Sequence, residues 1–389
     1  MSDSFELLIV GGGPAGLSAA RAYRDARGHG AVGIVTDEHR MPYNRPPLTK
    51  ELLRGEASED DLLIESEAWL REHEVSLVSG RAVALDAARR AVTLSGGREL
   101  RYRDCLLATG AEPTRLPVPG ADDPAVRVVR SLDHVRELTG RLADGDSVVV
   151  IGSGFIGCEI AASLRRRGHR VALVSDESQP NAKRLGVEAA EQIHRWLDEE
   201  GVTVSFGTEV DAIVAGDRTL EVRAGAVRAH GKVVVMATGV APRSELAAAA
   251  GLELDGGAVP TNAAMRTERS GLYAAGDVAI AHNSSAGRRL RVEHWGDALG
   301  QGEVAGRSAA GDDARWDAVP GFWSTIGNHT LKYAAWGDGF EQVRLAQHSR
   351  GGFTAWYGRE EKIVGVLSHE ADEDYERGRS LIAEGAPWR

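Results

Sequence analysis

Two glycine-rich turns, each between an apolar strand and a helix, constrain the fold more than any other feature of the sequence. The first turn, Gly11-Gly-Gly-Pro-Ala-Gly16, follows the apolar run Phe5 to Val10 and precedes a predicted helix over residues 17–27. The second, Gly152-Ser-Gly-Phe-Ile-Gly157, follows residues 147–151 and precedes a predicted helix that ends at Arg167. A strand, a G-x-G-x-x-G turn and a helix in this order are typical of a dinucleotide-binding βαβ unit. The repeat predicts an α/β chain with two Rossmann-like dinucleotide-binding domains.

Each residue type in these turns has a physical reason. The first glycine permits the tight turn, the second lets the backbone approach a pyrophosphate, and the third lets the helix pack on its strand. The helix N-terminus then offers N–H groups and a positive dipole to the phosphates. The candidate cofactor-binding residues of the two turns are Gly11, Gly13, Pro14, Ala15 and Gly16, and Gly152, Gly154, Phe155, Ile156 and Gly157. Asp37 follows the next strand of the first unit, where a carboxylate can accept hydrogen bonds from ribose hydroxyls.

Further glycine elements extend the pattern. An apolar strand followed by Ala-Thr-Gly occurs after each unit and adds Ala108, Thr109, Gly110 and Gly239 as candidate site residues. In Gly271-Leu-Tyr-Ala-Ala-Gly276-Asp277, Gly276 permits a close backbone approach and Asp277 can accept hydrogen bonds from a polyol. The alternative is a strand followed by a helix that Asp277 caps. We predict that the second nucleotide domain, residues 113–242, is inserted in the first, residues 1–112 and 243–317, and that residues 318–389 form a third, α+β domain.

Composition excludes several classes of function. The chain has 389 residues with 57 acidic and 46 basic side chains, a net charge of −11, so its average surface repels nucleic acid and anionic lipid. Its two cysteines, Cys105 and Cys158, form neither a C-x-x-C pair nor a Cys/His cluster, so we expect no metal site, disulfide scaffold or protein-bound iron–sulfur cluster. The absence of a signal sequence and of a long apolar run favours a cytoplasmic location without membrane contact.

The motifs together resemble the flavoprotein reductases with two dinucleotide sites, a group that includes ferredoxin and rubredoxin reductases, putidaredoxin reductase and apoptosis-inducing factor. The similarity covers almost the whole chain, and its most specific string is Arg45-Pro-Pro-Leu-Thr-Lys50. This string separates the branch from disulfide reductases, whose redox cysteine pair is missing here. Both cysteines lie in predicted apolar elements, so we interpret them as inert packing residues.

The resemblance implies FAD in the first nucleotide site and a nicotinamide dinucleotide in the second. It assigns Ala15 to the pyrophosphate, Asp37 to the adenosine ribose, the Val83 backbone to the adenine and Asp277 to the ribityl chain. It also places four side chains beside the flavin, namely Arg45, Lys50, Arg130 and Trp295. A cation beside flavin N5 favours the anionic reduced flavin, which makes Lys50 a candidate catalytic residue. The alternative is a solvated surface lysine.

Glu159, at the start of the second helix, is the other candidate catalytic residue, because its carboxylate can reach the flavin–nicotinamide junction and pair with Lys50. Alternatively, it only complements the helix dipole. Glu293 resembles a second carboxylate on the nicotinamide side, although an ion pair with Arg288, Arg289 or Arg291 explains it equally well. Trp323 resembles an aromatic side chain near the flavin, but Thr325 departs from the usual aspartate that follows Trp-Ser. Six of the eight tryptophans lie in the last 95 residues, which predicts an aromatic-rich lid or interface.

Ser175, Asp176 and Glu177 follow the second strand of the second unit, and these two carboxylates would repel a 2′-phosphate, which favours NADH over NADPH. The leading hypothesis is an NADH-dependent reductase that passes electrons through FAD to a 2Fe–2S ferredoxin-type carrier serving an oxygenase, such as a cytochrome P450 or a ring-hydroxylating dioxygenase. Ferredoxins and rubredoxins are acidic, so docking requires a local basic patch, either Arg288, Arg289 and Arg291 or the run 165–167. The alternatives are direct reduction of a quinone or oxygen, and a non-enzymatic flavin sensor of NADH.

Overall fold

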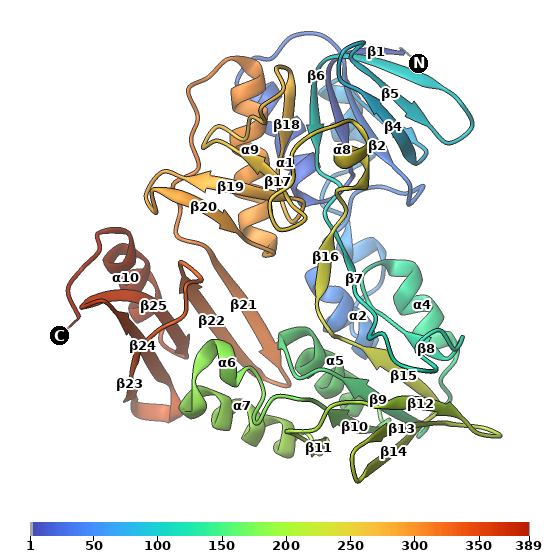
Figure 1. Ribbon diagram of the computed structural model, residues 1–389, viewed down its shortest axis with the longest axis vertical. Helices are drawn as coiled ribbons and strands as arrows, with labels where there is room; N and C mark the ends of the chain where they lie inside the picture. Colours follow the sequence, from blue (N-terminus) through green and yellow to red (C-terminus); the bar gives the residue numbers. More distant parts are fainter. Residues whose placement is uncertain (1–2, 389) are drawn as a thin grey trace.

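The computed structural model describes residues 3–388, which form two nucleotide-binding-type sheets, one above the other in Figure 1, and a third sheet beside them. We call them the N-terminal, central and C-terminal sheets. The predicted fold class, α/β with two Rossmann-like units and a C-terminal α+β part, is confirmed by the sheet topology. Within residues 3–388, no helix is long and apolar enough to cross a membrane.

The N-terminal sheet is built on the strand that precedes the first glycine turn. Its order is β3-β2-β1-β6-β5-β4, and β18 also pairs with β6; β1, β2, β3, β6 and β18 are parallel, whereas β4 and β5 extend the sheet in antiparallel fashion. Leu8 and Ile9 are both fully buried because each faces a covered side of the sheet, as is usual for parallel sheets. The strands are β1 (Ser4–Val10), β2 (Val32–Thr36), β3 (Val75–Ser79), β4 (Ala82–Asp86), β5 (Ala91–Leu94), β6 (Glu99–Leu107) and β18 (Leu272–Ala274).

Two helices cross each other closely over this sheet. Helix α1 (Pro14–Asp25) begins three residues earlier and ends two residues earlier than the predicted helix over 17–27, because Pro14 is well suited to the first turn of a helix. Helix α9 (Trp295–Ala310) lies against it. A Cβ atom on Gly302 or Gly306 would lie 2.2 Å from the carbonyl oxygen of Ala15 or Ala19. The absence of a side chain at these two glycines therefore permits the close crossing.

The central sheet repeats the arrangement around the second glycine turn. Its five parallel strands have the order β11-β10-β9-β15-β8, and a three-stranded antiparallel sheet, β12-β13-β14, adjoins it. Helix α5 (Phe155–Arg166) follows the turn, as predicted, and α7 (Val187–Glu199) follows β10. The remaining elements are β8 (Val126–Arg127), α4 (Leu132–Gly140), β9 (Ser147–Ile151), β10 (Arg170–Val174), α6 (Ala182–Leu185), β11 (Thr203–Ser205), β12 (Ala212–Ala215), β13 (Leu220–Ala224), β14 (Val227–Gly231) and β15 (Val233–Met236).

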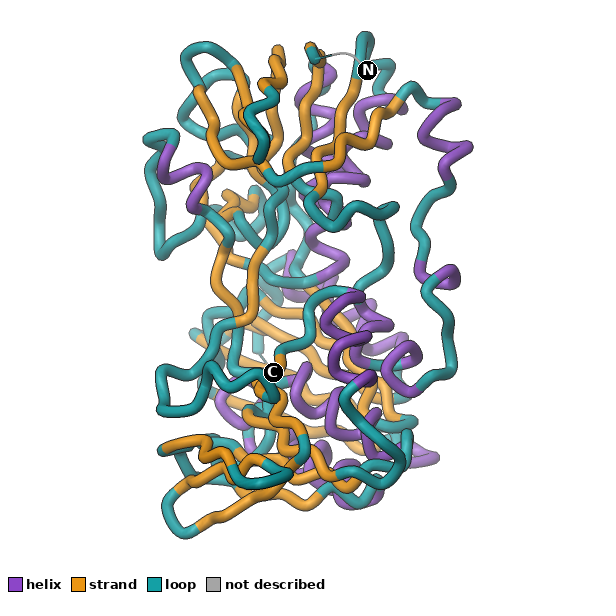
Figure 2. The backbone as a smooth tube through the Cα atoms, turned by 90° about the vertical axis from the view of Figure 1, so that its right-hand side faces the viewer, coloured by secondary structure: helices purple, strands orange, loops and turns teal. Residues whose placement is uncertain are grey.

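A two-stranded ribbon of β7 (Ala111–Pro113) and β16 (Val240–Pro242) carries the chain into and out of the central unit. It connects the upper and lower halves of the molecule in Figures 1 and 2. The limit predicted at 112/113 falls inside this ribbon and the limit predicted at 242/243 falls at its end, and we propose both as domain limits. One segment of the predicted first domain does not pack with that domain. Residues 43–62 pack instead into the core of the central unit, through Tyr43, Leu48, Leu53 and Leu62. This excursion contains η1 (Pro46–Thr49), α2 (Glu51–Arg54) and η2 (Asp60–Leu62).

The C-terminal sheet has the order β21-β22-β25-β24-β23 and is entirely antiparallel. Because side chains alternate along a strand, one face packs on the central unit and the other is partly covered by α10 (Asp372–Ala383). Ser324 on β21 and Leu331 on β22 belong to the first face, whereas Trp323 and its cross-strand partner Lys332 belong to the second. The strands are β21 (Gly321–Ile326), β22 (His329–Ala335), β23 (Gln342–Gln347), β24 (Phe353–Arg359) and β25 (Lys362–His369), and η3 (Ser349–Gly351) precedes β24.

No helix begins at Asp277 in the part of the chain that the structure describes, so the alternative of a helix capped by Asp277 is wrong. The chain instead enters the small sheet β17-β19-β20, because the tight turn at Gly276, with φ of 77°, leads directly into a strand. The strands of this sheet are β17 (Val259–Thr261), β19 (Ala279–Asn283) and β20 (Arg288–Arg291), and the helices not yet described are α3 (Glu67–Glu72) and α8 (Glu245–Ala249).

The glycines of the two turns perform two separable tasks. A Cβ on Gly157 would lie 1.9 Å from the Gly152 carbonyl oxygen, whereas a Cβ on Gly154 would meet no atom within 4 Å. Gly154 also has φ of −65° and ψ of 177°, a conformation that alanine adopts readily. Gly16 and Gly13 show the same contrast in the first turn. The third glycine is therefore required for packing, and the second leaves space open above the turn.

We expect Gly157→Ala to lower the thermal unfolding midpoint by about 3 °C or more, because overpacking against backbone costs about 3 kcal/mol or more and each kcal/mol shifts the midpoint by roughly 1 °C in a chain of this size. Gly154→Ala, the matched control, should leave the midpoint within about 1 °C of the wild-type value. Circular dichroism melts of the two variants without added ligand provide the measurement. Equal shifts for both variants would contradict the division of tasks.

Candidate active site

A buried ion pair lies between the segment of residues 43–62 and helix α5, against strand β21 of the C-terminal sheet. Lys50 Nζ is 2.8 Å from Glu159 Oε2, and the two side chains are only 7% and 2% exposed. Lys50 precedes α2, whereas Glu159 lies in the first turns of α5, so residues 109 positions apart form the contact. Two buried charges require each other and additional hydrogen bonds, since the loss of hydration costs several kcal/mol per ion. The predicted contact is therefore present, and neither residue is a solvated surface side chain.

The Arg-Pro-Pro-Leu-Thr-Lys string forms a short helix that places Lys50 against α5. Pro46 and Pro47 begin the short 3₁₀ helix η1, which runs to Thr49 and leaves Lys50 facing α5. Ser163 of α5 donates a hydrogen bond to the Thr49 carbonyl oxygen at 2.7 Å and so attaches the segment to the central unit. Thr49 Oγ1 donates to Glu159 Oε2 at 2.5 Å, and Lys50 Nζ also donates to the Pro46 carbonyl oxygen at 3.2 Å.

The open space above each turn fits the phosphates of a dinucleotide. Gly13 and Gly154 face no neighbouring atom within 4 Å, and Ile156 is 48% exposed on the first turn of α5. A pyrophosphate needs this approach to backbone N–H groups, because α1 and α5 both begin at their glycine without a capping side chain. The Ala15 side chain is buried beside Gly276, so only its backbone is available for such a contact. The residues present therefore fit two bound dinucleotides.

Charged side chains from distant segments gather around Asp277, which is 8% exposed. Arg130 Nη2 donates to Asp277 Oδ2 at 2.6 Å, and Arg45 Nη1 donates to the Arg130 carbonyl oxygen at 2.6 Å. Arg45 also pairs with Glu38 Oε1 at 2.5 Å, so three of the residues predicted to bind FAD, namely Arg45, Arg130 and Asp277, belong to one connected network. A guanidinium and a carboxylate in one network offer both donors and acceptors to a polar ligand.

Glu38 is a member of this network that the sequence analysis missed. Tyr43 Oη donates to Glu38 Oε2 at 2.5 Å, and burial raises the pKa of Tyr43 to about 12, so the phenol keeps its proton. Burial also acts to raise the pKa of Glu38, but the charge of Arg45 and the Tyr43 hydrogen bond hold it below its usual value. Asp37, chosen from its position after β2, is exposed. An acid beside Arg45 in the folded chain could not be recognised from strand spacing alone.

The nucleotide-selecting end of β10 also has a defined geometry. Ser175 is buried and its hydroxyl accepts a hydrogen bond from Ser153 at 2.8 Å, so the exposed Asp176 is the acid that faces solvent. Lys183 Nζ lies 3.6 Å from Asp176 Oδ2 and partly offsets its charge. The predicted repulsion of a 2′-phosphate therefore depends on Asp176 and on the half-buried Glu177 next to it.

The other predicted positions divide into packed and exposed groups. The Ala108 carbonyl oxygen lies against Gly11, where a Cβ would be 2.0 Å from it, and Thr109 Oγ1 donates to the Arg243 carbonyl oxygen at 2.6 Å. Gly110 and Gly239 have positive φ angles of 72° and 97°. Val83 is 53% exposed on β4 and Trp323 is 44% exposed on β21, whereas Trp295 is half-buried at the start of α9. The tryptophan-rich segment does not form one lid, because Trp316 and Trp356 are buried in two different cores.

Most of the predicted docking arginines are paired within the chain. Arg288 pairs with Asp338, and Arg291 Nη2 lies 2.8 Å from Glu293 Oε1. The ion pair that was the alternative for Glu293 is therefore present. Arg289 is exposed on β20 between these two pairs. In the runner-up run, Arg165 and Arg167 donate to carbonyl oxygens and Arg166 pairs with Glu200.

Thiol chemistry has no support in this structure. Cys105 on β6 and Cys158 on α5 are free and fully buried, and burial raises the pKa of both thiols. A thiol that is buried and protonated is a poor nucleophile. Both cysteines are therefore packing residues, in agreement with their interpretation from the sequence.

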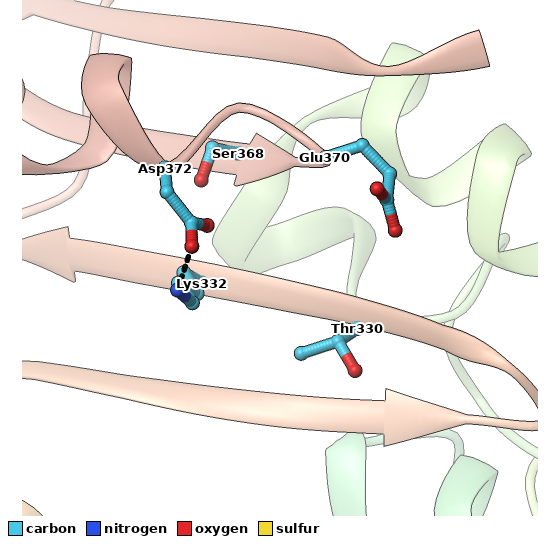
Figure 3. Close-up of a pocket in the computed structure, with 5 residues that line it drawn as sticks. All are labelled: Thr330, Lys332, Ser368, Glu370 and Asp372. Carbon is cyan, nitrogen blue, oxygen red and sulfur yellow. Dashed lines mark ion pairs between the residues drawn. The ribbon is translucent and has the colours of Figure 1, made fainter. Parts of the chain in front are cut away.

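A pocket of about 380 Å³ lies on the outer face of the C-terminal sheet (Figure 3). Lys332 and Asp372 form an ion pair of 2.7 Å across it. Lys332 is the cross-strand partner of Trp323, so the pocket lies on the face opposite to Ser324 and the buried ion pair. Its lining residues are Thr330, Lys332, Ser368, Glu370 and Asp372. None of these lining residues belongs to a glycine turn or to the buried ion pair, so the pocket is separate from the candidate active site.

We expect the Glu38 network to contribute stability that depends on pH. The pKa of Glu38 is lowered in the folded chain, so this contribution is present above the unfolded value of about 4.3 and is lost as the pH falls through the folded value. Glu38→Gln should reduce stability at pH 7 by about 1–3 kcal/mol, and the difference from wild type should shrink as the pH falls below about 4. Thermal melts from pH 3 to 7, with Glu72→Gln as an exposed control, provide the measurement. A difference independent of pH would contradict this prediction.

Comparison with known proteins places this geometry in a family. Residues 5–302 match the pyridine nucleotide-disulphide oxidoreductase family. Rhodocoxin reductase of Rhodococcus erythropolis is 31% identical over 98% of this chain and 90% of its own. The ferredoxin–NAD(+) reductase component of the anthranilate 1,2-dioxygenase system of Burkholderia cepacia is 31% identical over 97% and 94%.

Solved structures agree with the sequence relatives. A ferredoxin reductase from Rhodopseudomonas palustris superimposes with a TM-score of 0.93 at 30% identity, covering 100% of this chain and 96% of its own. The reductase in a covalent putidaredoxin reductase–putidaredoxin complex gives a TM-score of 0.91 at 26% identity, with 99% and 94% covered. The predicted resemblance is confirmed. The chain belongs to the pyridine nucleotide-disulphide oxidoreductase family and is an oxidoreductase without a cysteine pair.

Proposed function

We propose that this protein is an NADH-dependent flavoprotein reductase that passes electrons to a ferredoxin-type 2Fe–2S carrier, which in turn serves an oxygenase such as a cytochrome P450 or a ring-hydroxylating dioxygenase. The observation that carries the proposal is the buried Lys50–Glu159 pair between two open glycine turns, in a chain whose cysteines are inert. The cofactors of the chain are FAD and NADH. The relatives named as ferredoxin reductases support a carrier protein as the electron acceptor.

Each part of the site has a task in this proposal. The turn at Gly13 holds FAD, and the turn at Gly154 holds NADH, through N–H groups at the helix N-termini. When bound, FAD accepts a hydride from NADH and releases the electrons to the carrier. Lys50 places its ammonium at the reacting edge of the flavin and favours negative charge there. Glu159 holds this ammonium and so keeps the cation in one position.

The remaining site residues bind and orient. We propose that Asp277 and Arg130 bind the ribityl chain and flavin edge, that Arg45 and Glu38 order the segment before Lys50, and that Asp176 selects NADH. Trp295 closes the flavin from the side of α9, and Phe155 covers the nicotinamide side. Trp323, on the face of β21 opposite to Ser324, contacts only the exposed edge of the flavin. The Phe155 ring already contacts Phe322 edge-to-face, with 4.7 Å between centroids. These aromatic contacts exclude water from the reacting atoms, which strengthens the charge of Lys50 there.

The test of this function is rapid mixing of the purified yellow protein with NADH and with NADPH, followed by a panel of carriers. We expect kcat/KM for NADH to exceed that for NADPH at least tenfold, since Asp176 and Glu177 repel the 2′-phosphate, and we expect fast electron transfer to a ferredoxin. Comparable efficiency with both nucleotides would refute the NADH preference. Fast turnover with a quinone or oxygen and none with carriers would favour a direct reductase, and slow reduction with a long-lived charge-transfer complex would favour a sensor.

We propose that an acidic carrier docks beside the flavin through Arg289, together with Arg288 and Arg291 once their acidic partners are displaced. Arg289→Glu should slow reduction of the ferredoxin, most strongly at low salt, and should leave NADH-dependent reduction of ferricyanide unchanged. Arg218→Glu, an exposed position on the loop before β13, is the matched control and should change neither rate. Equal loss of both activities in Arg289→Glu would exclude a docking role at this position.

A further inference from the structure

The two oxygens of the buried Glu159 carboxylate accept hydrogen bonds from two different parts of the molecule. Oε2 accepts hydrogen bonds from Thr49 Oγ1 and Lys50 Nζ, both from the segment before α2. Oε1 accepts a hydrogen bond from Ser324 Oγ at 2.7 Å, and the Thr325 backbone N–H lies at 3.4 Å from the same oxygen. The C-terminal sheet therefore supplies the donors to the oxygen that Lys50 does not use.

Ser324 is confined as tightly as the carboxylate that it contacts. Ser324 is 1% exposed on the inner face of β21, which packs on α5. Phe322, on the same face of the strand, holds the register through its contact with Phe155. Because a buried hydroxyl next to a carboxylate must donate to it or remain without a partner, Ser324 has one favourable orientation.

The turn between β21 and β22 fixes this strand on the central unit at its other end. Arg166 Nη1 donates to Asn328 Oδ1 at 2.6 Å, and the His329 ring stacks on Trp196 of α7 with 4.6 Å between centroids and 4° between planes. His329 Nε2 lies 3.1 Å from Glu199 Oε2. Contacts at both ends of β21 thus hold the Ser324 hydroxyl at a constant position over Glu159.

We infer that Ser324 is a positioning residue for the reductase reaction: it binds Oε1 of Glu159 and thereby directs Oε2 toward Lys50. This inference rests on the proposed function. Lys50 donates to Glu159 and to the Pro46 carbonyl oxygen, so the protein holds two of its three N–H groups in defined directions. Without Ser324 the carboxylate can rotate, and the ammonium loses its defined position. The C-terminal sheet then completes the site from a part of the chain that carries neither glycine turn.

The chain offers well-matched variants for a test. Ser324→Ala removes the inner hydroxyl of the β21–β22 hairpin, and Thr330→Val removes an outer hydroxyl of the same hairpin, which bonds only to Thr325 Oγ1 at 3.0 Å among the described contacts. Thr49→Val removes the second hydroxyl on Glu159, and Thr49→Ser retains it. The readouts are the limiting rate of flavin reduction in single-turnover mixing, the dissociation constant of NADH, and the flavin reduction potential from a dye-coupled titration without NADH.

Ser324→Ala and Thr49→Val should each lower the limiting rate about tenfold, the effect of one lost hydrogen bond to a buried charge, with the NADH dissociation constant within about twofold of wild type. Their flavin potentials should become more negative, because the cation is less well placed. Thr49→Ser, which keeps the hydroxyl, should recover most of the rate and potential lost in Thr49→Val, and Thr330→Val should behave as wild type. Equal behaviour of Ser324→Ala and Thr330→Val, in rate and in potential, would overturn the inference.

A double-mutant cycle separates this inference from the proposed function. Among the described residues no hydrogen bond joins Ser324 to Lys50, and both bind Glu159. Unfolding of the wild type, Ser324→Ala, Lys50→Met and the double variant should therefore reveal a non-additive stability effect. Additive effects would refute positioning through Glu159 whatever the reaction. Wild-type protein that NADH fails to reduce would refute the proposed function and leave the outcome of the cycle intact.

Discussion

The ion pair of Lys50 and Glu159 is the interaction on which the arrangement of the other parts depends. Burying two charges is unfavourable unless each is opposed by the other and by hydrogen bonds, so the donors must be brought together accurately. Residues 43–62 leave the N-terminal sheet to supply Lys50 and Thr49, α5 supplies Glu159, and β21 supplies Ser324. The carboxylate of Glu159 thus joins this segment, the central unit and the C-terminal sheet through hydrogen bonds.

The glycines show how one residue type can serve two different needs. At Gly157 and Gly302 a side chain would collide with backbone, so glycine permits helix packing there. At Gly13 and Gly154 no atom lies within 4 Å of the position of a Cβ, so glycine there leaves room for a ligand. Composition alone counts 47 glycines without separating these groups. Only the neighbours of each position distinguish a packing requirement from a binding requirement.

The charge of the chain shows a related limit. A net charge of −11 describes the average surface, whereas docking and cofactor binding depend on individual pairs. The sequence predicts a basic patch that includes Arg288 and Arg291, but both side chains have acidic partners. Arg291 pairs with the nearby Glu293, and Arg288 pairs with Asp338, which lies 50 positions away. The effective positive charge at β20 is consequently smaller than the sequence suggests, because partners that are distant in the chain are adjacent in space.

The sequence by itself determined the local units and their order: two strand–turn–helix units, the Arg-Pro-Pro-Leu-Thr-Lys string, and two cysteines unsuited to redox chemistry. These features follow from short-range rules, since the requirements of a turn, a strand or a helix start are met within a few residues. Only the tertiary structure decided that Glu38 joins Arg45, that Asp277 leads into a strand, that residues 43–62 belong with the central core, and that Ser324 binds Glu159. Those contacts join segments up to 165 positions apart, and no local pattern records which side chains will meet once the sheets have packed.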